Sequence, residues 1–175
     1  MAIVEEVDAV LRSLHDVWDE DAVDEFDHAL QAAARAIADG ADDELILAAA
    51  LHDLGHSPLF GEDWAEHHDC VARDWLTPRF GQRVGWLAGA HVAAKRYLVA
   101  TDPGYVTTLS DTSVDTLDHQ GGAGVDPAFV KHPWWADAVR LRRYDDAAKL
   151  PNGLGASVED VIAIAKRVLN QHDRR

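Results

Sequence analysis

The amino-acid sequence predicts an all-α fold, a single bundle of helices spanning residues 1–175. Apolar residues recur three and four positions apart along most of the chain, which is the spacing of amphipathic helices. Strand signals are weak, because no run alternates valine, isoleucine or threonine with polar residues, and no Asn-Gly turn joins two such runs. A chain of this length can bury roughly 70% of its unfolded surface, so it needs neither a disulfide nor a metal merely to fold.

Seven helices follow from this periodicity. They cover residues 4–18, 22–40, the stretch from Asp42 or Asp43 to the pair His52-Asp53, 63–76, 83–100, 133–150 and 158–172. Either aspartate can cap the third helix, and Gly40 ends the second. We expect residues 101–127 to form a long loop with one short helix, begun by Ser110 or Ser113, and residues 151–157 to form a turn.

Composition narrows the classes of function. The net charge of −15 argues against a nucleic-acid partner, whose phosphates require basic patches. One cysteine, Cys70, excludes an internal disulfide and fits a reducing compartment. Residues 1–16 lack the pattern of a signal peptide, and no apolar run approaches the ~18 residues of a membrane span. We therefore expect a cytoplasmic protein with no membrane partner.

The stretch AALHDLGHSP at residues 49–58 is the first sign of a functional site. The apolar run LILAAAL ends in the adjacent pair His52-Asp53, and His56 follows. A solvated helix end would be served by lysine or arginine. An imidazole beside a carboxylate instead suits metal binding or proton transfer.

Six polar residues are candidates for such a site. They are His28, His52, Asp53, His68, His91 and Asp145. Five lie on apolar helix faces or at an apolar helix end, whereas the face of His28 is mixed, with polar Asp24, Glu25 and Gln31 but apolar Ala32 one turn on. A lone buried histidine is more often hydrogen-bonded than a metal ligand, but four histidines and two aspartates from five helices are best satisfied together by cations. Six ligands exceed what one zinc takes and suit two metals with a bridging aspartate, and imidazole with carboxylate favours iron or manganese. Asp146 could replace Asp145, although the face shared with residues 138, 141 and 148 favours Asp145.

The order of these residues resembles the HD-domain superfamily, whose core pattern is H…HD…D. The closest resemblance is to HD proteins associated with phosphonate degradation, a group of mixed-valent di-iron oxygenases related to myo-inositol oxygenase. It rests on the stretches EFDHALQAAARAIADGADDELILAAALHDLGH, HHDCVARDWL, GAHVAAKRYL, LSDTSVDTLDHQGG and DAVRLRRYDDAAK. The resemblance implies an HD-domain helical bundle that holds two iron ions as Fe(II)/Fe(III), with the six residues above as ligands and Asp53 as the bridge.

The resemblance also implies a site for a small anionic phosphonate. Lys95 and Arg142 would hold the phosphonate oxygens, helped by Ser113 and Gln120, with Lys95 and His56 as catalytic residues. Spacing agrees for two of these, since Lys95 lies one turn after His91 and Arg142 three residues before Asp145. The alternatives are solvated faces for the cations, which we favour for Arg96 and Arg143, and a loop-capping role for His56.

One stretch departs from the family pattern. The family often has Y-G-x-E ten to seven residues before the first histidine ligand, where the tyrosine is thought to cover one iron and the glutamate to contact the substrate's amino group. Trp18 and Asp21 occupy those places here. An indole N–H only donates and cannot ligate iron. Trp18 could stack over a quaternary ammonium group or serve as a hydrophobic staple, and Asp21 keeps the negative charge on a shorter side chain.

The function this resemblance implies is dioxygenase cleavage of a C–P bond. The substrate would be a 1-hydroxyphosphonate such as 1-hydroxy-2-aminoethylphosphonate, its trimethylammonio analogue or hydroxymethylphosphonate, and O2 would convert it to a carboxylate and phosphate. The alternative is a metal-dependent phosphohydrolase of the same superfamily, because the same ligands could activate a hydroxide. A binding module without catalysis is a third class, which full retention of six ligands disfavours.

Overall fold

The computed structural model describes residues 2–20, 22–61 and 67–172. Within those ranges all regular structure is helical and no strand occurs, as expected. The main helices are α1 (Ile3–Ser13), α2 (Glu25–Ala38), α3 (Asp43–Leu51), α4 (His68–Phe80), α5 (Gln82–Gly89), α6 (His91–Thr101), α7 (Asp111–His119), α8 (Pro127–Val130), α9 (Trp135–Asp146) and α10 (Val158–His172). Short 3-10 turns cover η1 (Leu54–His56), η2 (Pro58–Phe60) and η4 (Tyr105–Thr108).

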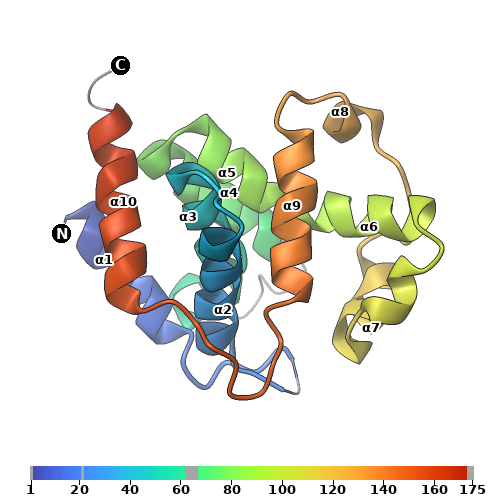
Figure 1. Cartoon of the computed structure of the whole chain (residues 1–175), viewed down its shortest axis with the longest axis horizontal. Helices are drawn as coiled ribbons and strands as arrows, with labels where there is room; N and C mark the ends of the chain where they lie inside the picture. Colours follow the sequence, from blue (N-terminus) through green and yellow to red (C-terminus); the bar gives the residue numbers. More distant parts are fainter. Residues whose placement is uncertain (1, 21, 62–66, 173–175) are drawn as a thin grey trace.

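Helix α3 is the centre of the core. Every residue from Leu45 to Leu51 is buried, which explains why this run is apolar on all sides. Helices α2, α5, α9 and α10 pack around it, and α4 lies along α5. In Figure 1, α1 and α10 lie on one side of α2 and α3, and α9 lies on the other side, with α6 and α7 beyond it. The C-terminal end of α3 is therefore inside the protein, where Leu51 and the following His52 are buried.

Two capping choices that the sequence leaves open are decided by hydrogen bonds. The Asp42 side chain accepts from the backbone N–H of Leu45 at 3.0 Å, so Asp42 caps α3. The Ser110 hydroxyl accepts from the backbone N–H of Ser113 at 3.1 Å, so Ser110 caps α7. Helix α10 has the expected bounds.

The helix predicted over residues 83–100 is wrong as a single element. Helix α5 ends at Gly89 and α6 begins at His91, with Ala90 between them. Glycine is a poor helix residue. The break also frees the backbone carbonyl of Ala88, which lies 2.6 Å from His91 Nδ1. Sequence periodicity does not reveal the break at Ala90, because the apolar inner face of α5 is followed directly by that of α6.

Other helix bounds also differ from expectation. Helix α1 ends at Ser13 rather than residue 18, because Asp16 adopts a left-handed conformation (φ 59°) and its N–H donates to Asp24 Oδ2. Helix α4 continues past residue 76 through Pro78, because Phe80 is fully buried in the core. Helix α2 begins at Glu25 rather than 22, α9 covers less than 133–150, and the 101–127 segment contains η4 as well as α7. Predicted helix positions 63–66 lie outside the described residues.

None of the helices in the described ranges is long and apolar enough to cross a membrane.

Candidate metal centre

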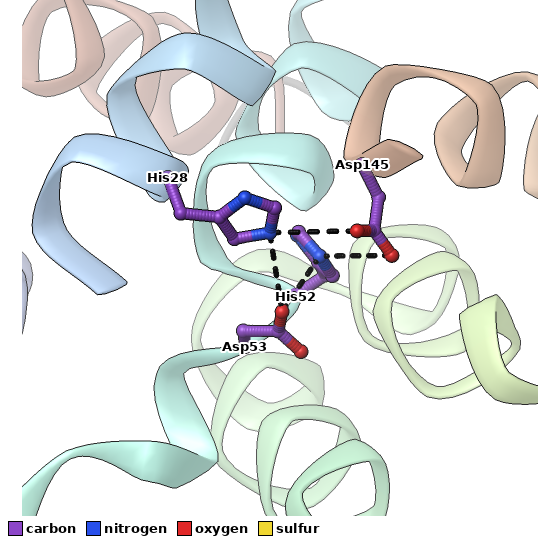
Figure 2. Close-up of side chains that lie close together, drawn as sticks. All are labelled: His28, His52, Asp53 and Asp145. Carbon is purple, nitrogen blue, oxygen red and sulfur yellow. Dashed lines mark ion pairs between the residues drawn. The ribbon is translucent and has the colours of Figure 1, made fainter. Parts of the chain in front are cut away.

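Six side chains predicted as ligands converge at the inner ends of five helices. His28 comes from α2, His52 and Asp53 directly follow α3, His68 and His91 are the first residues of α4 and α6, and Asp145 lies in the last turn of α9. The four histidines and Asp145 are buried, none being more than 8% exposed. Figure 2 shows four of these side chains pointing toward one another.

Asp53 lies between two pairs of histidines. Its Oδ2 atom is 3.3 Å from His28 Nε2 and 3.0 Å from His52 Nε2. Its Oδ1 atom is 3.5 Å from His68 Nε2 and 3.3 Å from His91 Nε2. Each carboxylate oxygen therefore faces a different pair of imidazole nitrogens, the arrangement expected of a carboxylate that bridges two cations.

Asp145 closes the first half of the site. Its Oδ1 atom is 3.5 Å from His28 Nε2, and its Oδ2 atom is 3.5 Å from His52 Nε2. The potential ligand atoms of His28, His52, Asp53 and Asp145 all lie within 4.8 Å of one another. His56 joins the other half, since Asp53, His56 and His68 meet the same criterion and the His56 and His68 rings stack at 4.5 Å.

Backbone carbonyls fix the orientation of three of these imidazoles. His28 Nδ1 is 3.0 Å from the carbonyl of Ala148, His52 Nδ1 is 2.8 Å from that of Ala49, and His91 Nδ1 is 2.6 Å from that of Ala88. A carbonyl oxygen only accepts, so Nδ1 carries the proton and donates. In the neutral ring Nε2 then presents a lone pair to the centre of the site.

The chemistry of this donor set fits bound cations. A lone pair on Nε2 and a carboxylate oxygen 3.0–3.5 Å away repel each other unless a cation or a proton lies between them. His28 Nε2, His52 Nε2 and Asp53 Oδ1 are buried without a hydrogen-bond partner among the described residues. Such buried polar atoms are costly when unsatisfied, and shared metal ions would satisfy all three.

The charges of the site are strongly coupled. Burial opposes ionisation of Asp53, but the charge of His52 and the close imidazoles of His28 and His91 hold the pKa of Asp53 well below its usual value. Burial would lower the pKa of His52, yet Asp53 and Asp145 raise it well above its usual value. Burial also opposes ionisation of Asp145, but Arg142 and Lys149 hold its pKa well below its usual value. Both carboxyl groups are therefore charged.

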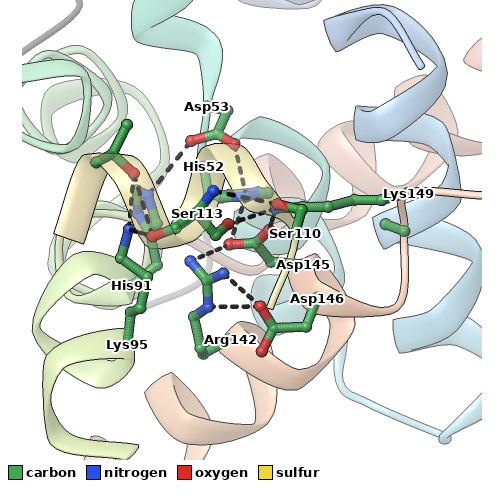
Figure 3. A network of polar contacts seen from close by, with 12 residues as sticks. His52, Asp53, His91, Lys95, Ser110, Ser113, Arg142, Asp145, Asp146 and Lys149 are labelled. Atoms are coloured by element: carbon green, nitrogen blue, oxygen red, sulfur yellow. Dashed lines mark hydrogen bonds and ion pairs between the residues drawn. The ribbon is translucent and has the colours of Figure 1, made fainter. Parts of the chain in front are cut away.

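A cavity of about 210 Å³ opens beside this cluster. Its acidic lining residues outside the cluster are Asp19, Glu20 and Glu25. The predicted ligands other than His52 also line it, together with His56. The remaining polar lining residues include Lys95, Thr112, Ser113, Thr116, Gln120, Arg142 and Lys149. One group of lining residues is thus acidic and another basic, in a chain with a net charge of −15. The basic residues, shown in Figure 3, make the cavity suitable for an anion.

Lys95 is the cation least committed to other groups. It is 2% exposed, and its Nζ atom donates to the Ser113 carbonyl at 3.2 Å and to Thr116 Oγ1 at 3.0 Å. No carboxylate pairs with it among the described residues. Burial, reinforced by the positive charge of Arg142, lowers the pKa of Lys95 to about 8. An anion in the cavity would supply the missing counter-charge.

Two curated relatives identify the family. The chain is 38% identical to the hydroxymethylphosphonate dioxygenase of Gimesia maris over an alignment of 143 residues, which covers 75% of this chain and 70% of the relative. It is 36% identical over 132 residues to the glycine-betaine-forming [1-hydroxy-2-(trimethylamino)ethyl]phosphonate dioxygenase of Leisingera caerulea, covering 70% of this chain and 67% of the relative. The chain belongs to this family of phosphonate dioxygenases. An uncharacterised protein of Acanthamoeba polyphaga mimivirus is 34% identical over 137 residues, covering 72% of this chain and 63% of that protein. No family model matches the sequence.

Of the residues predicted to contact the substrate of this phosphonate dioxygenase, some line the cavity and others do not. Ser113 and Gln120 line the cavity, and Gln120 Oε1 is buried without a hydrogen-bond partner in the described chain. Trp18 is 61% exposed and does not line the cavity, so its position gives no support to stacking on a substrate. Asp21 lies outside the described residues. Arg142 lines the cavity, but its guanidinium also contacts Asp145 at 2.7 Å.

Sequence reasoning missed two lining residues that lie three or four positions from the proposed ligands, Glu25 on α2 and Lys149 just beyond the end of α9. Lys149 follows Asp145 by four residues, and its Nζ atom donates to Glu20 Oε1 at 2.6 Å and to Ser113 Oγ at 2.9 Å. Glu25 precedes His28 by three residues and is 2% exposed. The spacing could have revealed both. Of the cations assigned to the surface, Arg96 donates to the carbonyls of Gly121 and Gly122, and so holds the loop after α7.

Gly55 sets how closely α4 approaches the HD pair. A Cβ atom at Gly55 would lie 2.5 Å from the backbone oxygen of His68 and 2.6 Å from its Cα atom. Because both contacts are with backbone, the start of α4 would have to move. We expect Gly55→Ala to destabilise the protein by about 1–3 kcal/mol and to displace His68 from Asp53, which lowers metal content.

Thermal unfolding and metal analysis of Gly55→Ala measure these two effects. Gly104→Ala is the matched control, because a Cβ there would meet only Asp102 Oδ1 at 3.7 Å, an ordinary contact. Wild-type stability and metal content in Gly55→Ala would contradict the steric argument.

Proposed function

We propose that this protein is a di-iron dioxygenase that cleaves the C–P bond of a small 1-hydroxyphosphonate. The observation that supports the proposal most directly is the position of Asp53, whose two oxygens face separate pairs of histidine nitrogens. The proposal includes a single domain of the HD superfamily over residues 1–175 and a cytoplasmic location.

The donor set divides between two iron ions. His28, His52 and Asp145 would hold one iron, His68 and His91 the other, and Asp53 would bridge them. Imidazole and carboxylate ligands suit iron, and a mixed-valent Fe(II)/Fe(III) pair would supply the redox chemistry of dioxygen. The same proposal accounts for the buried atoms His28 Nε2, His52 Nε2 and Asp53 Oδ1, which have no hydrogen-bond partner among the described residues.

The protein's own groups would bind and orient the substrate. Lys95 and Arg142 would hold the phosphonate oxygens, together with Lys149, which also lines the cavity. Ser113 and Gln120 would donate hydrogen bonds from α7 and its C-terminal cap. His56, stacked on His68, lies close enough to the second half of the site to hydrogen-bond there. Burial of these groups limits water around the reacting carbon.

The overall reaction balances without a further reductant. For hydroxymethylphosphonate, one O2 converts the substrate dianion to formate, hydrogen phosphate and one proton, so the C–P bond breaks and the carbon is oxidised. Hydrolysis of a phosphate ester by the same metals would require no O2. Membership of a dioxygenase family favours the oxidative reaction over the phosphohydrolase alternative.

Iron-loaded protein should consume one O2 for each phosphate released from a 1-hydroxyphosphonate. Oxygen electrode and phosphate assays measure the ratio, and EPR of the loaded protein should show a coupled Fe(II)/Fe(III) signal that sharpens with substrate.

His68→Ala should lose one of the two irons and the signal, because it removes a ligand from one half of the site. His15→Ala is the control, since His15 is exposed. Anaerobic phosphate release at the same rate would refute the proposal.

Substrate binding should weaken as the pH rises through about 8. Below this pH Lys95 is a cation that attracts the phosphonate, and above it the amine becomes neutral, since its pKa is lowered to about 8. KM measured from pH 6 to 9.5 should therefore rise above pH 8 in the wild type. In Lys95→Arg the guanidinium stays charged, so the rise should be smaller. Ionisation of the phosphonate affects both proteins equally, and identical pH profiles would exclude this role for Lys95.

The buried carboxyl group of Glu25 indicates whether the substrate carries a cationic group. Glu25 Oε2 is buried without a partner among the described residues, and burial, together with repulsion from Asp53 and Asp19, raises the pKa of Glu25 well above its usual value. A cationic group on the substrate would relieve this repulsion. The substrate named for the Leisingera relative carries a trimethylamino group, whereas the one named for the Gimesia relative does not.

Glu25→Gln should therefore reduce kcat/KM by about 10-fold for a trimethylammonio or amino substrate, and much less for hydroxymethylphosphonate. Steady-state kinetics with the three candidate substrates measure this discrimination. Asp27→Asn is the matched control, because Asp27 is exposed on the same helix. An equal loss for all substrates would mean that Glu25 supports the site without distinguishing substrates.

A further inference from the structure

Arg142 connects the metal cluster to residues outside it. The side chain is 3% exposed and its Nη1 atom lies 2.7 Å from Asp145 Oδ2. Its Nη2 atom pairs closely with Asp146 Oδ1, and its Nε atom donates to the same oxygen at 3.0 Å. All three guanidinium nitrogens are thus engaged by two neighbouring carboxylates of α9, as Figure 3 shows.

Tyr105 completes this arrangement from a different part of the chain. It lies in η4, between α6 and α7, and is 1% exposed. Its hydroxyl donates to Asp146 Oδ2 at 2.5 Å and accepts from Arg142 Nε at 3.1 Å. The tyrosine therefore contacts both members of the Arg142–Asp146 pair, and its hydroxyl uses both its donor and an acceptor site.

Asp146 supplies a second negative charge to the Arg142 guanidinium. Arg142 is a buried cation and needs a buried counter-charge. If Asp145 were its only partner, the guanidinium would compete with a metal ion for both oxygens of that carboxylate. Because Asp146 neutralises Arg142 from the other side, Arg142 contacts Oδ2 of Asp145 and leaves Oδ1 to His28 Nε2 at 3.5 Å and Lys149 Nζ at 3.6 Å.

We propose that Tyr105 and Asp146 are positioning residues for the metal ligand Asp145, and that they act through Arg142. This inference rests on the proposed function only in taking Asp145 as a ligand. Partners of metal ligands commonly contribute 10- to 100-fold to metal affinity, because they fix the direction of the ligand. Arg142 also lines the substrate cavity, so the same contacts join the metal cluster to the wall that binds the substrate.

Tyr105→Phe is the most conservative test. It keeps the buried ring, over which the Arg143 guanidinium lies at 5.1 Å, and removes only the hydroxyl. Metal affinity is measured by anaerobic competition for Fe(II) between the metal-free protein and a chelator. We expect about 10-fold weaker binding, an altered EPR signal of the loaded protein, and a lower kcat, with little change in the melting temperature of the metal-free protein.

Tyr144→Phe is the matched control. Tyr144 is also a buried tyrosine whose hydroxyl contacts an aspartate, Asp39, but it lines no part of the cavity. Its loss should leave Fe(II) affinity and the EPR signal unchanged. Equal effects of the two substitutions on metal affinity would overturn the proposal, because they would reveal a general structural cost.

Asp146→Asn tests the electrostatic step separately. The amide keeps the shape but not the charge, so Arg142 should shift onto Asp145 and weaken Fe(II) binding by about 10- to 100-fold. Asp137→Asn removes another paired carboxylate of α9, which contacts Arg83 and Arg140, and should leave Fe(II) affinity unchanged. If Tyr105→Phe and Asp146→Asn both bind Fe(II) as tightly as the wild type, and the wild type binds two irons, the positioning role is refuted. Failure of the wild type to bind iron would instead refute the proposed function.

Discussion

The hydrogen bonds between imidazole Nδ1 atoms and backbone carbonyls are the constraint on which the rest of the site depends. Helices end with carbonyl groups that lack intrahelical partners. In this protein, carbonyls near the ends of α3, α5 and α9 accept from His52, His91 and His28. The helix ends are satisfied, and each ring is turned so that Nε2 points inward. The fold thus uses one interaction both to end its helices and to orient its nitrogen ligands.

The distribution of charge follows from the same compact arrangement. An acidic chain would repel an anionic substrate at long range, but local groups dominate in a buried cavity. Lys95 and Lys149 line the cavity together with Glu20 and Glu25, and Lys149 pairs with Glu20 at 2.6 Å. Arg142 stands between the metal cluster and this cavity, held on its other side by Asp146. Arg142 and Lys149 therefore balance buried carboxylates, whereas Lys95 has no carboxylate partner in the described parts of the chain.

The sequence predicted where most helices lie better than it predicted the residues at which they begin and end. Periodicity located the core helices because burial requires an apolar face, and α10 has the expected bounds. It failed at Ala90, where both flanking helices keep apolar inner faces although the chain changes direction. It also failed at Asp16, where the left-handed conformation and the bond to Asp24 end α1. Both errors depend on contacts that local patterns do not contain.

The sequence by itself determined the all-α class, the inward direction of the histidines and aspartates, and the family, because spacing along a helix fixes which residues share a face. Only the tertiary structure decided how those faces meet. It directed Asp145 rather than Asp146 toward His28 and His52, gave Asp146 to Arg142 and Tyr105, and left Trp18 exposed. These outcomes depend on atoms from segments far apart in the chain, and such distances are set by packing rather than by residue type.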